Sequence, residues 1–406
     1  MNLPTASVHP PRATEIPQWN PSLKGLRCLR CNTTYRVALH HTGCPLCEAE
    51  GHHVSLAASY QGPARSGVRL PFRGVLSLGE GSTPALDLPA LAREVGVARL
   101  SIKDESRNPT GSHKDRMSAF GAAHALAAGA DTVVLSSSGN AAISAAAYCQ
   151  AAALACEVAT YADMPPAYVH ELERLGARRL TFDDNQARWQ YVAARAQDPR
   201  VLALTNHKLP ALGSAPLALE GYKLIAAEIA GAMPVPGHIL VPTSRGDLIW
   251  GIYRGFCELV ESGQVDAMPR LWAVEPYARL GYVLAGEPLH GDYPGNTAQF
   301  STAGSTVTWL QFEATTRSGG GAVDIDDGRA RAARSALLQA GFAPELCSAA
   351  ALAALQALVG SGRIGALDHA LLILTASTAR DPSWPDLVSA ASPSIPPSLP
   401  FVGASS

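Results

Sequence analysis

The chain has 406 residues, of which 16% are charged and 47% hydrophobic, and its formal net charge at pH 7 is −2. This length suffices for about two or three domains, and the near-neutral charge gives no overall field that would attract nucleic acid or an anionic membrane. A small neutral or zwitterionic ligand suits this balance better, so we expect neither a nucleic-acid nor a membrane partner.

Both ends of the chain are rich in proline and polar residues. Residues 1–25 contain five prolines and no apolar core of the kind found in secretory signals, so we expect a cytoplasmic protein. Residues 383–406 form a Pro/Ser-rich tail, and such a composition does not build a core. The most apolar stretch, residues 141–162, is rich in alanine but contains Gln150 and Glu157. We interpret it as a buried helix and strand rather than a membrane span.

Four of the eight cysteines form a pattern near the N-terminus. They make two Cys-x2-Cys pairs separated by twelve residues, and they are Cys28, Cys31, Cys44 and Cys47. Four thiolates at this spacing are typical of a tetrahedral zinc site, and a site closed by protein ligands alone is structural. We therefore predict a zinc-ribbon-like segment over residues 26–75, with a role in folding or assembly. Two disulfides are the alternative, which is disfavoured in a chain without an export signal.

From about residue 98 the sequence alternates between strand-like and helix-like segments. Short apolar runs predict strands, which cover residues 99–103, 132–136, 157–161, 179–182, 201–205, 238–241, 271–274 and 370–374. A helix is predicted over about 114–128, and an Ala-rich helix begins near residue 141. Such alternation is typical of parallel sheets covered by helices on both faces. We predict an α/β protein with two mainly parallel sheets.

The first candidate for chemistry is Lys114, in the run Ser112-His-Lys-Asp115. Ser112 and Asp115 have the spacing of a capping box, which places Lys114 in the first turn of its helix. The positive end of the helix dipole and a partly dry site both lower the pKa of an amine. Lys114 is therefore a candidate nucleophile. A solvated lysine at a helix start is the alternative on spacing alone.

Two further turns lie between a strand and a helix, where backbone N–H groups can bind an anion. They are Ser136-Ser-Ser-Gly-Asn140 and Val241-Pro-Thr-Ser-Arg-Gly-Asp-Leu248. Hydroxyls, a glycine and, in the second turn, a guanidinium suit a carboxylate or a phosphate. An ordinary turn capped by Asn140, and a surface pair of Arg245 with Asp247, are the alternatives.

Taken in order, these motifs resemble one family. They are Asn108-Pro-Thr-Gly-Ser-His-Lys-Asp-Arg116, Ser-Ser-Gly-Asn140, Val-Pro-x-x-x-Gly246 and Thr375 at the end of a strand. They are similar to the pyridoxal 5′-phosphate (PLP) enzymes of the tryptophan synthase β-subunit fold, fold type II, and especially to threonine synthases. The resemblance covers about residues 76–382 and implies an enzyme of amino-acid metabolism.

The resemblance also implies roles for single residues. Lys114 would hold the cofactor as a Schiff base and act as the catalytic amine, Asn140 would face its 3′-oxygen, and Thr375 would bind the pyridine nitrogen. The cofactor phosphate would lie in the turn formed by Thr243, Ser244, Arg245, Gly246 and Asp247. The substrate carboxylate would be bound by Ser137, Ser138 and Gly139, with Asn206 as a further substrate contact.

The sequence departs from the threonine synthase pattern at the substrate end. Those enzymes often have a threonine after Ser-Gly-Asn and an arginine before Leu-Glu-Gly, and both serve the phosphate of O-phosphohomoserine. This chain has Ala141 and Ala218 at these positions. An unpaired phosphate in a closed site is strongly unfavourable, so a phosphorylated substrate is not implied. His113 replaces the usual phenylalanine before the lysine, and we interpret it as a packing residue rather than a proton shuttle.

We therefore predict PLP-dependent elimination or replacement on a small amino acid by a threonine synthase-like lyase. A serine/threonine dehydratase or a β-replacement synthase is the alternative within this cofactor class. A catalytically silent regulatory homologue is the alternative of another class, against which the presence of Lys114, Asn140 and Thr375 argues. Relatives are commonly dimers, so the resemblance implies a homodimer.

The resemblance further implies two domains around the cofactor. We expect a large PLP-binding domain formed by residues 76–108 and 220–382, and a small mobile domain at 109–219 that closes onto the substrate. Residues 1–25 are expected to form a flexible N-terminus before the zinc-ribbon-like segment.

Overall fold

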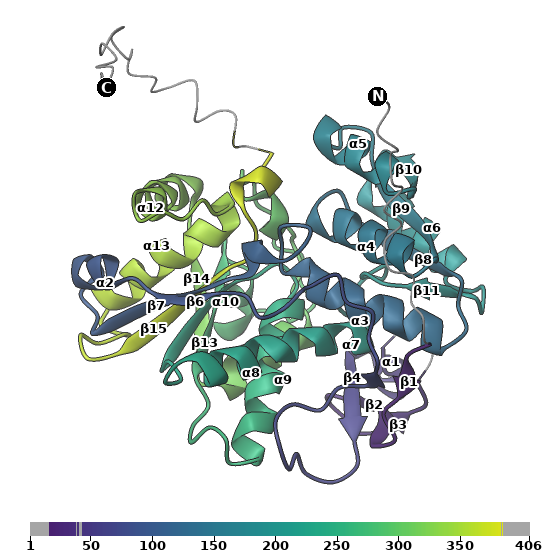
Figure 1. Ribbon diagram of the computed structural model, residues 1–406, viewed down its shortest axis with the longest axis horizontal. Coiled ribbons are helices and arrows are strands. Elements are labelled where there is room, and N and C mark those ends of the chain that lie inside the picture. The colour runs from purple at the N-terminus through teal and green to yellow at the C-terminus, as the bar shows by residue number, and fades with distance from the viewer. Residues whose placement is uncertain (1–15, 38, 40–42, 383, 385–406) are drawn as a thin grey trace, which may run out of the picture.

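The computed structural model of the chain describes residues 16–37, 39, 43–382 and 384. Residues 1–15 of the expected flexible N-terminus, and nearly all of the tail expected over 383–406, lie outside the described residues. Figure 1 shows two groups of strands packed against helices, and a smaller N-terminal group of strands at the bottom of the view.

The larger sheet has six strands in the order β14-β13-β12-β15-β7-β6. Neighbouring strands are parallel except β6, which pairs antiparallel with β7 at the edge. The strands are β6 (Ala85–Asp87), β7 (Arg99–Asp104), β12 (His238–Pro242), β13 (Arg270–Glu275), β14 (Gly321–Asp324) and β15 (His369–Leu374).

Hydrophobic cores cover both faces of this sheet. In β12, Ile239 and Val241 pack into one core and Leu240 into the other, because side chains alternate along a strand. The first face is covered by α8 (Lys223–Ala232), α9 (Asp247–Glu261), α10 (Leu280–Leu284) and α11 (Trp309–Arg317). The second face is covered by α2 (Pro89–Val95), α12 (Asp327–Gln339) and α13 (Leu346–Gly360). Burial on both faces explains why the central strands are continuous apolar runs.

The smaller sheet has four parallel strands in the order β10-β9-β8-β11. The strands are β8 (Thr132–Ser136), β9 (Ala155–Tyr161), β10 (Arg178–Phe182) and β11 (Val201–Ala203). One face packs against α3 (Lys114–Ala127), α4 (Asn140–Ala151) and α5 (Pro166–Arg174), and the other against α6 (Asn185–Arg195). The short α7 (Pro216–Leu219) then leads back to the larger sheet.

The predicted fold class is confirmed. Every strand predicted from residue 98 onwards is present, with ends that differ by two residues or fewer. The sequence pattern does not predict β6 and β14, because these edge strands are short and only partly buried. The strands of the smaller sheet all lie within 109–219 and those of the larger sheet within 76–108 and 220–382. We propose these ranges as two domains.

The N-terminal segment packs against helices, with β4 (Leu56–Tyr60) contacting α7 and β5 (Phe72–Arg73) contacting α3. An antiparallel sheet of β2 (Leu23–Cys28), β3 (Thr34–Tyr35) and β4 carries the helix α1 (Pro45–Ala49) between its last two strands. The strand β1 (Gln18–Trp19) pairs with β5. These elements begin inside residues 1–25, where composition alone suggests flexibility. The reason is a distant contact, since the Trp19 ring packs on Phe72 and its Nε1 donates to the Ala127 carbonyl at 3.2 Å.

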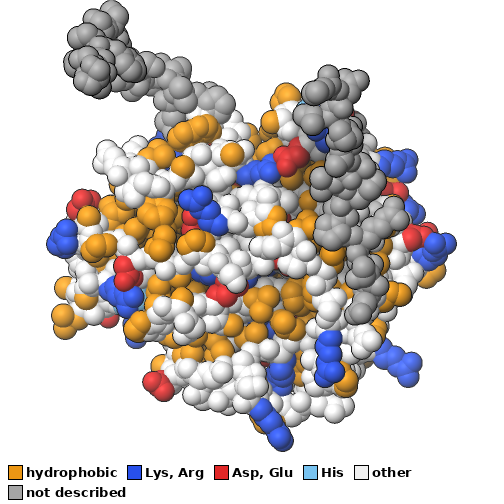
Figure 2. All heavy atoms as spheres, viewed as in Figure 1, with side chains coloured by type: hydrophobic (Ala, Val, Ile, Leu, Met, Phe, Trp, Pro, Cys, Tyr) orange, Lys and Arg blue, Asp and Glu red, His pale blue; other side chains and the backbone are white. Residues whose placement is uncertain are grey.

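Among the described residues, no helix combines the length and the apolar character needed to span a membrane. On the face seen in Figure 2, basic and acidic side chains are interspersed among polar and apolar ones. This distribution agrees with the near-neutral net charge.

Candidate active site

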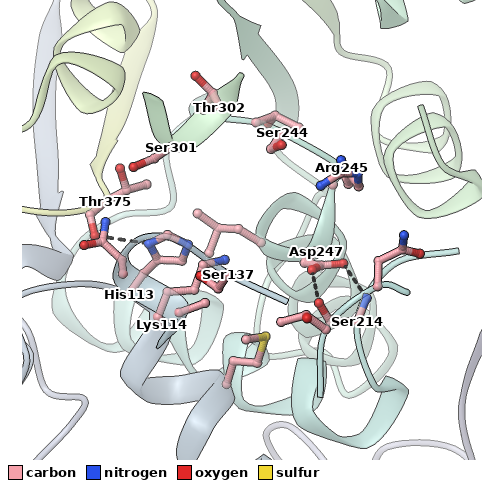
Figure 3. A pocket seen from close by; sticks show the side chains of 18 of the residues that line it. His113, Lys114, Ser137, Ser214, Ser244, Arg245, Asp247, Ser301, Thr302 and Thr375 are labelled. Atoms are coloured by element: carbon pink, nitrogen blue, oxygen red, sulfur yellow. Dashed lines mark hydrogen bonds between the residues drawn. The ribbon is translucent and has the colours of Figure 1, made fainter. Parts of the chain in front are cut away.

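A cavity of about 210 Å³ lies at the carboxyl ends of β8, β12 and β15 and the N-terminal ends of α3, α4 and α9. Carboxyl ends of parallel strands are where ligands bind in α/β sheets. All predicted cofactor and substrate residues line the cavity except Ser138 and Gly139. Figure 3 shows Thr375 and His113 at one end, Arg245, Asp247 and Ser214 at the other, and Lys114 with Ser137 between them.

Lys114 is the first residue of α3, as predicted. Its Nζ lies 3.5 Å from the Tyr222 hydroxyl and 5.9 Å from the centre of the Tyr222 ring. Burial lowers the pKa of this amine, and the charges of Asp247 and Glu345 oppose the effect without cancelling it. A lysine with a lowered pKa is a usable nucleophile and base.

The predicted capping box is wrong in detail. His113, not Ser112, is the N-cap of α3, and Asp115 does not reach back to the helix start. The Asp115 carboxylate instead accepts bonds from the Thr110 backbone N–H at 2.7 Å and the Thr110 hydroxyl at 2.5 Å. Asp115 therefore holds the loop that precedes Lys114, because a tight turn brings Thr110 closer to it than the first helical N–H groups.

His113 is buried and locked in place by the end of β15. Its backbone N–H donates to the Thr375 carbonyl at 2.9 Å, and its Nδ1 lies 3.1 Å from the same oxygen. The ring packs against Tyr222 with centres 5.6 Å apart. Burial lowers the pKa of His113 well below its usual range. These contacts are those of a neutral packing residue.

The turn after β8 presents Ser137 and Asn140 to the cavity. Asn140 begins α4 and its Nδ2 lies 3.4 Å from Glu345 Oε2, while its buried Oδ1 has no partner among the described residues. Ser138 points elsewhere, because its hydroxyl bonds Arg188 and Thr160 at 2.8 and 3.1 Å. Ser136 also lines the cavity, and its buried Oγ has no partner among the described residues, so the turn offers the cavity two hydroxyls and one amide.

The turn after β12 is shaped to bind an anion. Gly246 has a φ of +90°, and a Cβ there would lie 2.5 Å from the Gln311 Cβ. It is the N-cap of α9, and within the described ranges no side-chain cap bond reaches the first N–H groups of this helix. Free N–H groups at a helix start suit a phosphate.

Arg245 and Asp247 do not form an ion pair with each other within the part of the chain that the structure describes. The Asp247 carboxylate accepts bonds from the Ser214 N–H at 3.1 Å and the Ser214 hydroxyl at 2.6 Å. Arg245 Nε lies 3.3 Å from the Thr306 hydroxyl, and its guanidinium lies 5.3 Å from the centre of the Trp189 ring. Burial lowers the pKa of Arg245, and the charge of Asp247 opposes this shift without cancelling it.

Sequence reasoning missed Glu345, which lies behind Thr375. The Thr375 hydroxyl donates to Glu345 Oε1 at 2.7 Å, and the Ser301 hydroxyl donates to Oε2 at 2.9 Å. Burial raises the pKa of this carboxyl to about 7. Its one sequence signal is its position directly before the Ala-rich helix α13, where an acidic residue is favourable.

Sequence reasoning also missed Arg188 on α6. Its side chain lines the cavity and is only 7% exposed. It donates to the Ser138 hydroxyl at 2.8 Å and to Asn185 Oδ1 at 2.6 Å, and its guanidinium lies 3.8 Å from the centre of the Tyr161 ring. All these partners are formally neutral, and burial lowers the pKa of Arg188. A charged residue at the start of a helix gives no signal that it will be buried.

Three positions are tied to the substrate by resemblance, namely Asn206, Ala141 and Ala218. Asn206 lines the cavity, but its Oδ1 accepts the Leu212 N–H at 2.9 Å and its Nδ2 donates to the Lys208 carbonyl at 3.0 Å. Its amide thus shapes its own loop. Ala218 is fully buried and is not among the described cavity-lining residues, whereas Ala141 lines the cavity.

The four predicted metal ligands lie together at the N-terminal segment. The sulfur atoms of Cys28, Cys31, Cys44 and Cys47 are all within 4.8 Å of one another. All four cysteines are free thiols, so the two-disulfide alternative is not the arrangement found.

Known proteins resemble this chain in sequence. Residues 76–376 match the family model of pyridoxal-phosphate dependent enzymes. The threonine synthase of Methanosarcina acetivorans is 30% identical over 325 residues, which cover 76% of this chain and 78% of that protein. The threonine synthase of Mycobacterium leprae is 28% identical over 317 residues, which cover 76% and 84%.

Solved structures share the fold. Diaminopropionate ammonia lyase from Escherichia coli in complex with D-serine has a TM-score of 0.65 at 18% identity, covering 77% of this chain and 88% of that one. The processed form of threonine deaminase isoform 2 from Solanum lycopersicum has a TM-score of 0.63 at 17% identity, covering 76% and 82%.

Proposed function

This chain belongs to the family of pyridoxal-phosphate dependent enzymes of fold type II and is threonine synthase-like, and from that premise we propose that Lys114 carries out elimination or replacement on a small amino acid. The observation that carries the proposal is the position of the Lys114 amine. It lies between Thr375 and the turn at 243–247 in one cavity, with a lowered pKa.

The cavity residues fit pyridoxal phosphate at three points. The uncapped N–H groups of α9 suit its phosphate. The Asn140 amide has unused bonding capacity beside Lys114, and the Thr375 hydroxyl lies at the opposite end of the cavity from the phosphate turn. Pyridoxal phosphate, when bound, supplies an electron sink for negative charge that develops at the substrate Cα.

Lys114 moves the protons in this proposal. A lowered pKa keeps more of the amine neutral near pH 7, and a neutral amine can take a proton from Cα and deliver it to the leaving group. The Tyr222 hydroxyl and ring hold the amine from one side. At the far end, the Thr375 hydroxyl donates to Glu345 at 2.7 Å and would turn from this partner to the ring nitrogen when the cofactor binds.

The charge of Arg188 favours a substrate with an anionic group beyond its α-carboxylate. An uncompensated buried guanidinium is unfavourable until an anion reaches it. Arg188 comes from α6, so it supplies a cation that the sequence pattern at Ala141 and Ala218 does not predict. This arrangement supports our proposal of a threonine synthase-like replacement of an anionic leaving group.

A serine/threonine dehydratase is the second candidate, and Ala141 is the observation that favours it. Its methyl side chain lines the cavity and offers no hydroxyl to a substrate phosphate. A neutral hydroxy amino acid does not need such a contact.

Purified protein tests the proposal by its colour and its products. We expect the visible absorbance of bound cofactor, a spectral shift on adding a substrate amino acid, and loss of both in Lys114→Ala. Threonine and phosphate from O-phosphohomoserine indicate the synthase, and 2-oxobutanoate from threonine indicates the dehydratase. Colourless protein that cannot be reconstituted would contradict the proposal and support a silent regulatory homologue. A homodimer in the cytoplasm completes the proposal, and light scattering tests the dimer.

A further inference from the structure

The cysteine module is the segment from β2 to β4, which contains Cys28, Cys31, Cys44 and Cys47. The pocket loop is residues 204–215, between β11 and α7. We propose that metal bound by the cysteine module positions the pocket loop, so that removing the metal weakens amino-acid binding while the cofactor stays in place. This inference rests on the proposed function only for its choice of ligand.

The sulfur geometry fits one tetrahedral metal ion. Cys28 and Cys47 sulfurs are 3.6 Å apart, as are those of Cys31 and Cys44. Zinc with Zn–S bonds of about 2.3 Å places its ligands roughly 3.8 Å from one another. The backbone N–H groups of Arg30 and Cys31 both point at Cys28 Sγ from 3.4 Å, and such donors stabilise a metal-bound thiolate.

The cysteine module contacts the pocket loop directly. Glu48, next to Cys47, pairs with Lys208 at 2.5 Å. The Ser55 hydroxyl donates to the Leu212 carbonyl at 2.7 Å. Gly43, next to Cys44, packs so closely on Leu212 that an added Cβ would lie 3.0 Å from its side chain. Residues next to two of the four cysteine ligands thus contact the pocket loop.

The pocket loop carries cavity residues at both of its ends. Thr205 and Asn206 line the cavity near β11, and Ser214 lines it near α7. Leu212, held by the cysteine module, donates its N–H to Asn206 at 2.9 Å. Ser214 holds Asp247 through two hydrogen bonds. A shift of Leu212 would therefore move Asn206 at one end of the pocket loop and Ser214 at the other.

The metal is needed because α1 cannot hold its own shape. This helix has five residues, and isolated helices shorter than about 12 residues are marginal in water. Its N-cap is Cys44, and it contains Cys47 and Glu48. Sulfur ligation at Cys44 and Cys47 fixes both ends of this turn, and Glu48 keeps its place opposite Lys208 only while the turn persists.

The test uses the purified holoenzyme and measures metal content, cofactor absorbance and amino-acid titrations of the cofactor spectrum. We expect one zinc per chain. After chelation, or in Cys31→Ser, the cofactor absorbance should remain, and half-saturation by the amino acid should require about five- to tenfold more ligand, as for loss of one or two hydrogen bonds. Unchanged affinity in zinc-free protein would overturn the proposal, as would cysteine-intact protein that binds no zinc.

A second pair of variants separates the effect of the Glu48–Lys208 contact from the folding of the cysteine module. Glu48→Ala keeps all four sulfurs and removes the bond to Lys208, so it should retain zinc and still weaken amino-acid binding. Glu50→Ala is the matched control, because Glu50 pairs with Arg30 inside the cysteine module, and it should bind amino acids normally. Equal affinities for the two variants would contradict the inference.

Hydrogen exchange makes the test independent of the proposed function. Zinc removal should speed amide exchange in residues 204–215 of the chain, whether or not a cofactor is bound. Protein without cofactor but with zinc-dependent protection of this loop would refute the proposed function alone. Protein with cofactor but without such protection would refute this inference alone.

Discussion

Two ionisable groups of the cavity have pKa values shifted toward neutrality. Burial lowers the pKa of the Lys114 amine and raises the pKa of the Glu345 carboxyl to about 7. Both shifts have the same cause, since a dry site disfavours the charged form of either group. A carboxyl that can exchange a proton near pH 7, such as that of Glu345, is suited to acid–base chemistry.

Glu345 should make the stability of the protein pH-dependent. In the unfolded chain the carboxyl has its ordinary pKa of 4.5, so the folded state binds more protons between about pH 4.5 and 7. Stability therefore falls as pH rises through this window, by up to about 3 kcal/mol. Glu345→Gln should remove that fall. Thermal unfolding at pH 5 and pH 8 checks it, and the same pH dependence in both proteins would contradict it.

Arg188 should act on affinity rather than on the chemical step. Loss of hydrogen bonds to a charged group predicts about 10- to 100-fold weaker binding of an anionic substrate in Arg188→Gln, with binding of uncharged amino acids largely kept. The matched control is Arg195→Gln, because Arg195 lies on the same helix but pairs with Glu157 at 2.7 Å. Equal losses of affinity for anionic and neutral amino acids would contradict this role of Arg188.

At the scale of elements, the turn between β12 and α9 combines a left-handed glycine with an open helix start. Gly246→Ala should strain this turn, because φ is +90° and the new Cβ would meet Gln311 at 2.5 Å. We expect a loss of about 1–3 kcal/mol in stability and a fall in bound cofactor. Gly263→Ala, at the other end of α9, is the control. It also has a positive φ but no atom within 4 Å, so its cofactor content should stay unchanged.

Arg245 in the same turn should contribute to cofactor retention. Its guanidinium lines the cavity beside the open N–H groups of α9, where a phosphate could accept its bonds. Arg245→Ala should lose cofactor faster during dialysis than the parent protein. Identical absorbance after dialysis would show that Arg245 does not touch the phosphate.

At the scale of the whole molecule, a buried ion-pair network attaches α3 to the larger sheet. Arg116 Nε lies 2.6 Å from Glu105 after β7, and its Nη1 lies 2.7 Å from Glu228 on α8. Lys103 in β7 also pairs with Glu228, at 2.6 Å. Because Lys114 begins α3, this network positions the Lys114 amine relative to β15 and Thr375.

Glu105→Gln should destabilise the protein strongly. Removing one member of a buried pair typically costs about 3–5 kcal/mol, and Glu228 would then have to compensate both Arg116 and Lys103. Calorimetry or denaturant unfolding measures the change. Asp131→Asn, which breaks an exposed pair with Arg200, should cost less than about 1 kcal/mol. A loss of that small size for Glu105→Gln would show that the network is dispensable.

The sequence alone was sufficient to predict the buried strands of both sheets and the motifs at strand–helix junctions, but not the edge strands β6 and β14. Apolar runs identify buried strands, and Lys114, Asn140 and Gly246 stand at helix starts because local spacing sets the ends of helices. In a parallel sheet these junctions lie at one edge, so motifs far apart in sequence come to one cavity. The paired Cys-x2-Cys motifs likewise identify their own cluster.

Only the tertiary structure decided which charges are buried and which loops support the cavity. Glu345 meets Thr375, and Arg188 meets Ser138, across separations of 30 and 50 residues. The contact of Ser55 with Leu212 spans 157 residues. Such contacts follow from packing between elements rather than from local periodicity, and the pKa of a side chain depends on that packing. Neither these contacts nor the pKa values can be derived from the composition of the chain.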